Sequence, residues 1–339
     1  MKSPIRFGLI GAGGIAQTYA QVFQALDEVK LTAVADVRPD AARALAETAG
    51  CPWFASHSAL RESGECDAIL ICTPPSTHTA LCEDFLSHKI PVLCEKPLST
   101  DSSSARSLVA LAESTGTLFT MASKFRYCED VVRAKSIVES GILGEIVLFE
   151  NTFTSRVDMT NRWNSKVALS GGGVLIDNGT HSVDIVRYFL GPIAEVMAVE
   201  GKRVQGLSVE DTARIFVKSV SGVMGSIDLS WSLHKEIDSY IEVFGSHGTV
   251  RVGWKQSKYR QSSSPDWVVF GSGYNKVQAM GSQIRNFARA LLSEERLLIT
   301  GQDAIASVEV IESAYRSMRD SHWIPVKNST SLREKVAAA

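Results

Sequence analysis

The sequence lacks any apolar run long enough to cross a bilayer. A membrane-spanning helix needs about 20 consecutive apolar residues, whereas the apolar segments here are short, as in AILICTP. The N-terminal segment MKSPIRFGLIGAGG leads from a short apolar run directly into a glycine turn. It has neither the longer apolar core nor the small-residue cleavage site of a signal peptide. We therefore expect a cytoplasmic protein with no membrane partner.

The sequence also lacks a disulfide framework and a basic stripe. None of its six cysteines forms a C-x-x-C pair. Several lie in apolar, strand-like runs, which indicates buried free thiols in a reducing compartment. The net charge is −2 and both signs are interspersed along the chain, so we expect no nucleic-acid partner.

What the sequence does have is length and a strand–helix alternation. A chain of 339 residues is too long for one ordinary core, and two domains are expected. Over residues 1–123, apolar strand-like segments such as IRFGLIG, KLTAVADV and DAILICT alternate with helix-like segments. Strands that are apolar on both faces and alternate with helices predict a doubly wound parallel sheet of the Rossmann type, an α/β fold.

The pattern changes over residues 124–339. Short strand-like segments such as TARIFVKS and SYIEVFGS are separated by glycine turns such as SVSG and GSHG. This pattern predicts an α+β domain with an open, mainly antiparallel sheet. Two helices are expected late in the chain, around 277–293 and 302–320. We place the boundary between the two domains near residue 123.

The segment GLIGAGGIA follows the first expected strand and begins the first expected helix. Its spacing, G-x-G-x-x-A with Gly11, Gly13 and Ala16, fits the dinucleotide-binding fingerprint. Gly11 permits the tight turn, Gly13 lets the backbone approach a pyrophosphate, and Ala16 lets helix and strand pack closely. Gly14 and Ile15 lie at the helix N-terminus, which faces the phosphates in such sites.

An acidic residue stands where the fingerprint expects one. Asp36 ends the second expected strand, about 20 residues further on, where a carboxylate accepts hydrogen bonds from the adenosine ribose. This carboxylate favours NAD, because the 2′-phosphate of NADP would meet a like charge. Arg38, two residues later, can instead pair with that phosphate, so NADP stays open as the cofactor.

The segment ICTPPSTH follows a third expected strand. In open α/β sheets, ligands bind outside the carboxyl ends of the strands, so we expect the backbone of Thr73, Pro74 and Pro75 to face the cofactor. His78 has two interpretations: a cofactor contact, or an incidental residue of a rigid turn.

The segment CEKP lies at the same edge of the sheet, directly after another apolar strand. Glu95 is expected near the cofactor. Lys96, held by Glu95, can polarise a substrate oxygen. Pro97 restricts the lysine backbone to extended geometry, and the Lys96–Pro97 bond can be cis.

The segment GGGVLIDNGTHSVD places Asp177, His181 and Asp184 on one face of a helix that follows three glycines. We interpret the glycines as room for a flat group such as a nicotinamide ring. A histidine of near-neutral pKa suits the acceptance of an alcohol proton, and an aspartate one turn away can orient it. The pair also fits two metal ligands or a buried structural pair. No third ligand is evident, so we expect no metal.

Together, GLIGAGGIA, ICTPPSTH, CEKP and GGGVLIDNGTHSVD resemble the Gfo/Idh/MocA oxidoreductase family over essentially the whole chain. The resemblance implies a Rossmann domain, a nicotinamide cofactor, a sugar or cyclitol substrate, and a homodimer or homotetramer formed through the C-terminal sheet. It implies that Lys96 contacts the hydroxyl being oxidised and that His181, paired with Asp177, is the acid/base. It also implies that Arg126, in SKFRY, contacts cofactor and substrate, and that Trp163, in NRWN, lines the mouth of the site.

We therefore predict an NAD(P)-dependent dehydrogenase that transfers a hydride between nicotinamide and a secondary alcohol or ketone of a sugar, sugar derivative or inositol. One alternative is an NAD-retaining glycoside hydrolase of the same family; those relatives tend to carry an export signal. Another is a non-catalytic dinucleotide-binding regulator, which would have little reason to keep Lys96, Asp177 and His181.

Overall fold

The computed structural model describes residues 3–326, and the described chain divides into two compact units. The first unit holds the chain up to Tyr127 together with Lys276–Ile305. The second holds Cys128–Asn275 together with the chain from Ala306 onward. The sequence predicts a single division near residue 123; in the structure, the segment 276–305 returns to the first unit.

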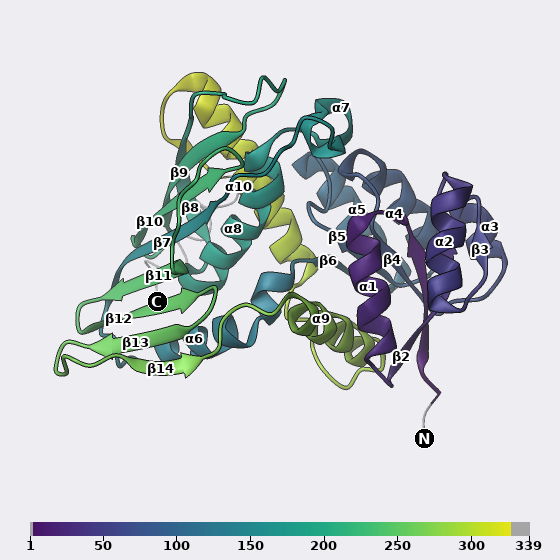
Figure 1. Cartoon of the computed structure of the whole chain (residues 1–339), viewed down its shortest axis with the longest axis horizontal. Helices are drawn as coiled ribbons and strands as arrows, with labels where there is room; N and C mark the ends of the chain where they lie inside the picture. Colours follow the sequence, from purple (N-terminus) through teal and green to yellow (C-terminus); the bar gives the residue numbers. More distant parts are fainter. Residues whose placement is uncertain (1–2, 327–339) are drawn as a thin grey trace. The chain divides into compact units, whose positions relative to one another are not determined.

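Six parallel strands form the sheet of the first unit, in the order β3-β2-β1-β4-β5-β6 (Figure 1). The strand order reverses between β1 and β4, which is the doubly wound Rossmann arrangement, and the predicted fold class is confirmed. The strands are β1 (Ile5–Ile10), β2 (Val29–Ala35), β3 (Trp53–Phe54), β4 (Ala68–Ile71), β5 (Val92–Glu95) and β6 (Phe119–Ala122).

The helices of this unit begin and end at the residues that local chemistry favours. Helix α2 (Pro39–Ala49) starts with a proline and ends at Gly50, which adopts the left-handed conformation with φ 66°. Asp101 caps helix α5 (Ser102–Thr115) by accepting a hydrogen bond from the Ser104 N–H. The other helices are α1 (Gly14–Gln24), α3 (His57–Glu62), η1 (Pro75–Thr77), α4 (His78–Ser87), η2 (Lys124–Tyr127) and α9 (Lys276–Leu291).

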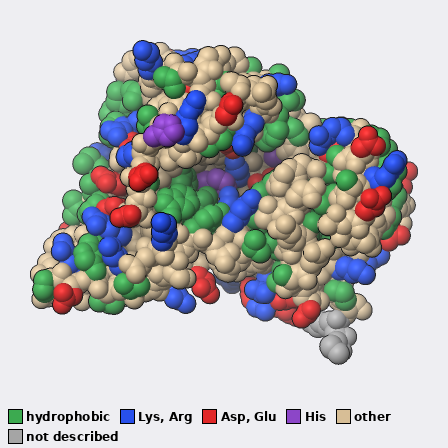
Figure 2. All heavy atoms as spheres, in the orientation of Figure 1, with side chains coloured by type: hydrophobic (Ala, Val, Ile, Leu, Met, Phe, Trp, Pro, Cys, Tyr) green, Lys and Arg blue, Asp and Glu red, His purple; other side chains and the backbone are tan. Residues whose placement is uncertain are grey.

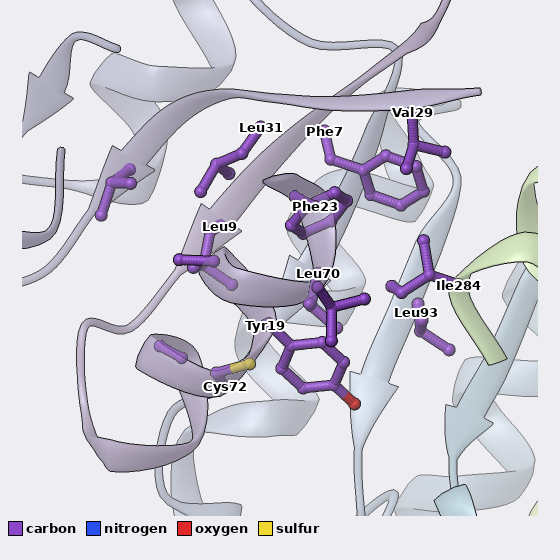
Figure 3. Packing of buried hydrophobic residues seen from close by; sticks show 14 of the residues in the cluster. Phe7, Leu9, Tyr19, Phe23, Val29, Leu31, Leu70, Cys72, Leu93 and Ile284 are labelled. Carbon is purple, nitrogen blue, oxygen red and sulfur yellow. The ribbon is translucent and has the colours of Figure 1, made fainter. Parts of the chain in front are cut away.

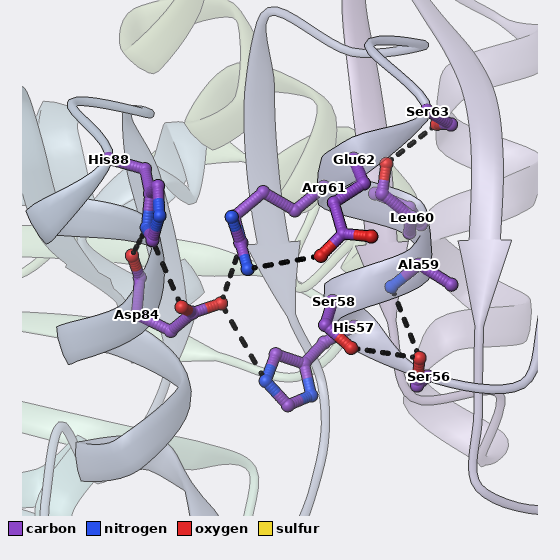
Figure 4. A network of polar contacts seen from close by, with 10 residues as sticks. All are labelled: Ser56, His57, Ser58, Ala59, Leu60, Arg61, Glu62, Ser63, Asp84 and His88. Atoms are coloured by element: carbon purple, nitrogen blue, oxygen red, sulfur yellow. Dashed lines mark hydrogen bonds and ion pairs between the residues drawn. The ribbon is translucent and has the colours of Figure 1, made fainter.

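Helices α3 and α4 are joined by a polar network around one carboxylate (Figure 4). Asp84 accepts a hydrogen bond from Arg61 at 3.0 Å and lies 3.6 Å from His57 and 3.5 Å from His88. The network ties two helices together at a partly exposed surface.

The apolar core of the first unit explains why the late segment belongs to it (Figure 3). The ring of Phe7, on β1, lies 5.2 Å from the ring of Phe23 and 6.0 Å from that of Phe287, on α9. Ile284, one turn earlier on α9, is buried in the same cluster. Helix α9 therefore completes a core that residues 1–123 begin.

Nine strands form the sheet of the second unit, in the order β14-β13-β12-β11-β7-β10-β9-β8-β15 (Figure 1). Neighbouring strands are antiparallel except β7 and β10, which are parallel. The mainly antiparallel sheet is thus confirmed. The strands are β7 (Ile146–Thr154), β8 (Ile193–Glu200), β9 (Thr212–Ser219), β10 (Met224–Ser230), β11 (Ser239–Gly245), β12 (Gly248–Gly253), β13 (Ser257–Gln261), β14 (Val268–Gly271) and β15 (Ile324–Pro325).

One face of this sheet is covered by helix α8 (Val174–Leu190), which packs against β7, β9 and β10. Phe149, on β7, lies with its ring 5.6 Å from that of Phe189 on α8, and Ile227 and Leu229 on β10 are buried as well. The remaining helices are α6 (Glu129–Glu139), η3 (Trp163–Ser165), α7 (Val167–Ser170) and α10 (Gly301–Asp320). Helices α9 and α10 confirm the two predicted late helices.

The structure also shows the state of the cysteines and the distribution of charge on the surface. All six cysteines are free. Figure 2 shows basic and acidic side chains interspersed over the visible face. Among residues 3–326, no helix has the length and apolar character that crossing a membrane requires. A cytoplasmic location stays a prediction.

Candidate functional site

The glycine turn after β1 is shaped so that only glycine fits its first position. Gly11 has φ +96°, a conformation that residues with a side chain rarely adopt. A Cβ built there would lie 2.9 Å from the carbonyl carbon of Cys72, which follows β4. Gly11 therefore brings the turn against the neighbouring strand end, as the fingerprint requires.

The N-terminus of α1 presents backbone N–H groups without a side-chain cap. Its N-cap is Gly13, and no acidic residue occupies the first turn. A Cβ at Gly13 or Gly14 would meet no heavy atom of the described residues within 4 Å. Ile15 is half-buried and Ala16 is fully buried against the sheet. Open space in front of N–H groups that no side chain of residues 3–326 caps fits a pyrophosphate.

Asp36 follows β2 and is bonded to the glycine turn itself. Its Oδ2 accepts a hydrogen bond of 2.7 Å from the Ala12 N–H, and its Oδ1 accepts one of 2.8 Å from the Arg38 N–H. Burial raises the pKa of Asp36, but these hydrogen bonds outweigh that effect and hold its pKa below the usual value. The Arg38 guanidinium lies 3.3 Å from the same carboxylate, and its side chain is 67% exposed against 9% for Asp36.

His78 is buried between two loops at the carboxyl edge of the sheet. Its Nδ1 lies 2.8 Å from the Pro97 carbonyl oxygen and its Nε2 lies 2.9 Å from the Thr73 carbonyl oxygen. Burial lowers the pKa of this histidine. The ring therefore holds the segments of Thr73–Pro75 and Lys96–Pro97 together, which favours the structural interpretation over a direct cofactor contact.

The lysine of CEKP follows directly from the end of β5. Glu95 and Lys96 are both half-buried, and the Lys96–Pro97 bond is cis, one of the two geometries expected. The Glu95 carboxylate accepts a hydrogen bond of 3.2 Å from the Lys96 N–H through Oε2 and one of 2.7 Å from the Tyr19 hydroxyl through Oε1. Glu95 therefore fixes the backbone on which Lys96 stands.

Arg126 lies in η2, at the end of the first unit. Its guanidinium is buried, lies 3.4 Å from the Asp303 carboxylate and donates a hydrogen bond of 3.5 Å to the Leu298 carbonyl oxygen. The family resemblance implies that Arg126 contacts cofactor and substrate, whereas these contacts join it to the first turn of α10 and to the loop before that helix. A contact with cofactor or substrate stays a prediction.

Asp177 and His181 lie on α8, and the helix expected there is confirmed. Asp177 is half-buried in the first turn, where its N–H donates to the Gly173 carbonyl oxygen at 3.0 Å, and His181 is buried one turn later. Trp163 lies in η3 with its side chain 41% exposed. Its place at the mouth of a substrate site stays a prediction.

The three glycines before α8 have a different cause from the one inferred from the sequence. Gly171 adopts φ +82° at the end of α7. A Cβ at Gly172 would collide with the Tyr315 hydroxyl, and one at Gly173 with the backbone of Glu210. The close approach is therefore to the second unit's own residues, and these glycines need no nicotinamide ring to explain them.

The same contacts hold the start of α8. The buried Glu210 carboxylate accepts hydrogen bonds from the Gly173 N–H at 2.9 Å, the Leu175 N–H at 3.0 Å and the Tyr315 hydroxyl at 2.8 Å, all through Oε1. Burial raises the pKa of Glu210. Glu210 acts as a remote cap for the helix that carries Asp177 and His181.

Comparison with known proteins decides the family. Residues 5–123 match the model described as "Oxidoreductase family, NAD-binding Rossmann fold", and residues 131–251 match the "GFO/IDH/MocA C-terminal domain". The chain belongs to the Gfo/Idh/MocA oxidoreductase family. It is therefore an oxidoreductase with an NAD-binding Rossmann domain.

Relatives of this Gfo/Idh/MocA oxidoreductase align along nearly all of its length. An inositol 2-dehydrogenase of Rhizobium meliloti is 26% identical over 95% of this chain and 99% of its own. A D-apiose dehydrogenase of Rhizobium rhizogenes is 23% identical over 95% of this chain and 97% of its own. A levoglucosan dehydrogenase solved with NADH and levoglucosan shares the fold, with a TM-score of 0.88 at 18% identity over 95% of this chain and 99% of that one.

The sequence predicts that Glu95 holds Lys96 in this oxidoreductase, but it does not predict the supporting residues Tyr19, Glu210 and Tyr315. Tyr19 and Glu95 are 76 positions apart, and Glu210 and Tyr315 are 105 positions apart. No local pattern marks such pairs. The only signal was a polar residue at a position where the helix pattern expects an apolar one, as at Gln283 on α9.

Proposed function

We propose that this oxidoreductase reversibly oxidises a secondary alcohol of a sugar, sugar derivative or inositol to the ketone. Two features of the same domain together carry the proposal. The glycine turn is hydrogen-bonded to Asp36, and Lys96 is half-buried directly after the end of β5. The names of the relatives, which are dehydrogenases of inositol and of apiose, support a neutral polyol as substrate.

The proposed roles follow from the chemistry of each side chain. NAD, held by the glycine turn and Asp36, would supply the acceptor for the hydride that leaves the carbon bearing the hydroxyl group. His181 accepts the hydroxyl proton, and Asp177, one turn earlier on α8, orients its ring. Lys96 stabilises the negative charge that develops on the oxygen. In the direction of reduction, His181 returns the proton to the carbonyl oxygen.

We propose NAD as the preferred cofactor. The Asp36 carboxylate is ionised, since its pKa is held low, and it lies where the adenosine ribose is expected. The Arg38 guanidinium is already within 3.3 Å of that carboxylate, which partly neutralises its charge. A 2′-phosphate would have to compete with Asp36 for this arginine.

The test is an assay of the purified protein with NAD or NADP and a panel that includes myo-inositol, D-apiose and levoglucosan, followed by the absorbance of reduced cofactor. We expect reduction with NAD and at least one polyol. If no compound of a broad panel causes cofactor reduction, and cofactor stays bound through purification, the proposal is contradicted. That result would favour the NAD-retaining glycoside hydrolase.

We also propose that the enzyme forms a homo-oligomer through the uncovered face of the second sheet. Phe216 and Met224 lie on that face and are 38% and 59% exposed. The cross-strand pair Arg214–Asp228 lies beside them. Exposed apolar side chains rimmed by charges are typical of interfaces. Light scattering of a Phe216→Asp variant should report a smaller assembly than that of the wild type.

A further inference from the structure

Three side chains from distant parts of the chain form a line of hydrogen bonds inside the first unit. The Gln283 amide, on α9, donates to the Tyr19 hydroxyl at 2.8 Å, and this hydroxyl donates to Glu95 Oε1 at 2.7 Å. Tyr19 and Gln283 are fully buried, and Tyr19 lies in the apolar cluster of α1, β4 and β5 (Figure 3).

The direction of this line is fixed by the groups that form it. The Gln283 Nε2 can only donate, so the Tyr19 oxygen accepts from it and uses its single proton for the Glu95 carboxylate. Burial and the neighbouring Glu95 charge raise the pKa of Tyr19 well above its usual value, which keeps the phenol protonated. Tyr19 is therefore a permanent donor to Glu95.

The line ends at the backbone of the proposed catalytic lysine. Glu95 Oε2 accepts the hydrogen bond from the Lys96 N–H at 3.2 Å. Both carboxylate oxygens are thus engaged, one by the buried line and one by the peptide group that carries Lys96. A carboxylate held on both sides fixes the position of that peptide group.

Core packing alone does not account for these polar residues. Phenylalanine and leucine would fill nearly the same volume at positions 19 and 283 without burying polar atoms. The Gln283 Oε1 has no hydrogen-bond partner among residues 3–326, so this amide carries an unmet polar group in the core. Since the Gln283 amide lowers the stability of the core, we infer that it is there to position the Tyr19 hydroxyl to which it donates.

We propose that Tyr19 and Gln283 are positioning residues for Lys96 and act on it through Glu95. This inference rests on the proposed function, in which Lys96 stabilises the developing negative charge. It assigns to α9, the helix that returns to the first unit from late in the chain, a part in placing the lysine.

The test compares Tyr19→Phe, Gln283→Leu and the double variant with the wild type. We expect each single variant to lower kcat about tenfold, the equivalent of roughly one hydrogen bond, with the Kd for NAD measured by calorimetry unchanged. The double variant should lose little more than either single one, because both act through the same carboxylate. The polyol used is the one of the panel above that turns over fastest.

A second readout needs neither cofactor nor turnover. Hydrogen exchange of the Lys96 amide, measured by NMR on the protein without cofactor, should become faster in both single variants because its acceptor is no longer held. The matched control is Phe23→Leu, which removes core volume from the same helix and from the same cluster. It should leave kcat and the exchange of the Lys96 amide as in the wild type.

The possible failures can be told apart. Wild-type kcat and Lys96 exchange in both single variants would overturn the positioning role while leaving the proposed function intact. A fall of kcat in Phe23→Leu as large as in Tyr19→Phe would overturn it as well, because general loosening of the core would then be sufficient. A fully active Lys96→Ala variant would instead overturn the proposed function itself. If Tyr19→Phe does not fold, Gln283→Leu alone decides the test.

Discussion

The Asp36 carboxylate accepts a hydrogen bond of 2.7 Å from the backbone N–H of Ala12. The residue expected to bind the adenosine ribose therefore also anchors the glycine turn expected to bind the pyrophosphate. Two parts of the proposed cofactor site, 24 positions apart in the chain, are joined by this hydrogen bond. We therefore expect the Asp36 side chain to affect cofactor binding more than a ribose contact alone would.

Replacing Asp36 should shift the choice of cofactor. In Asp36→Ala, we expect kcat/KM with NAD to fall about 100-fold, since charge-assisted hydrogen bonds to the ribose and to Ala12 are both lost. The ratio of NADP to NAD activity should rise, because Arg38 becomes free to meet a 2′-phosphate. Asp40→Ala, in the exposed first turn of α2, is the control. An unchanged cofactor ratio in Asp36→Ala would refute this assignment.

Replacing the proposed catalytic residues should lower turnover without preventing cofactor binding. Lys96→Ala and His181→Ala should each lower kcat about 1000-fold, the usual cost of losing a charge-stabilising donor or a general base. NAD binding, measured by calorimetry, should persist in both. The exposed Lys30 and His322 provide control substitutions to alanine. Near-normal turnover in either active-site variant would exclude the assigned role.

Burial of His78 predicts a loss of stability on mild acidification. Its pKa is lowered in the folded state, so the unfolded chain binds a proton that the native protein does not. The unfolding free energy should therefore fall as the pH decreases from about 7 through the unfolded value of about 6.5 toward the lower folded pKa. His78→Gln cannot titrate and should show a smaller decrease.

Thermal unfolding at several pH values measures this effect. His88→Gln, at a half-exposed position just after the C-terminal end of the helix that His78 begins, is the matched control and should keep the wild-type pH dependence. If the two glutamine variants follow the same pH curve, His78 is not the group responsible.

Removing the remote cap of α8 should destabilise the second unit. Glu210→Ala leaves two buried N–H groups and the Tyr315 hydroxyl without their acceptor, and we expect a loss of about 3 kcal/mol in the free energy of unfolding. Chemical denaturation measures it, with the exposed Glu145→Ala as control. A change as small as that of the control would show that Glu210 does not cap the helix.

The parts of the structure that the sequence predicted are those with local causes. Gly11 is identified by a turn between a strand and a helix, Asp36 and Lys96 by their places at strand ends, and the pair Asp177 and His181 by helical spacing. In each case the reason lies within a few residues of the site, so periodicity and turn chemistry are sufficient.

The parts that the sequence did not predict depend on distant partners. Arg126 bonds to Asp303, 177 positions away, and helix α9 joins the core begun by β1. Position 173 must be glycine because a side chain there would collide with the backbone of Glu210. The parallel pairing of β7 with β10 interrupts an otherwise antiparallel order of strands. Sequence patterns show which side chains are buried, but they do not show which distant residue each of them contacts.

Isotope transfer from substrate to cofactor would report the proposed hydride transfer itself. The enzyme would be incubated with NAD and a polyol that carries deuterium on the carbon of the reacting hydroxyl, and the reduced cofactor examined by NMR. We expect deuterium at C4 of the nicotinamide and a slower turnover of the deuterated polyol. Reduced cofactor without deuterium, or product formed with no change of the cofactor, would contradict it.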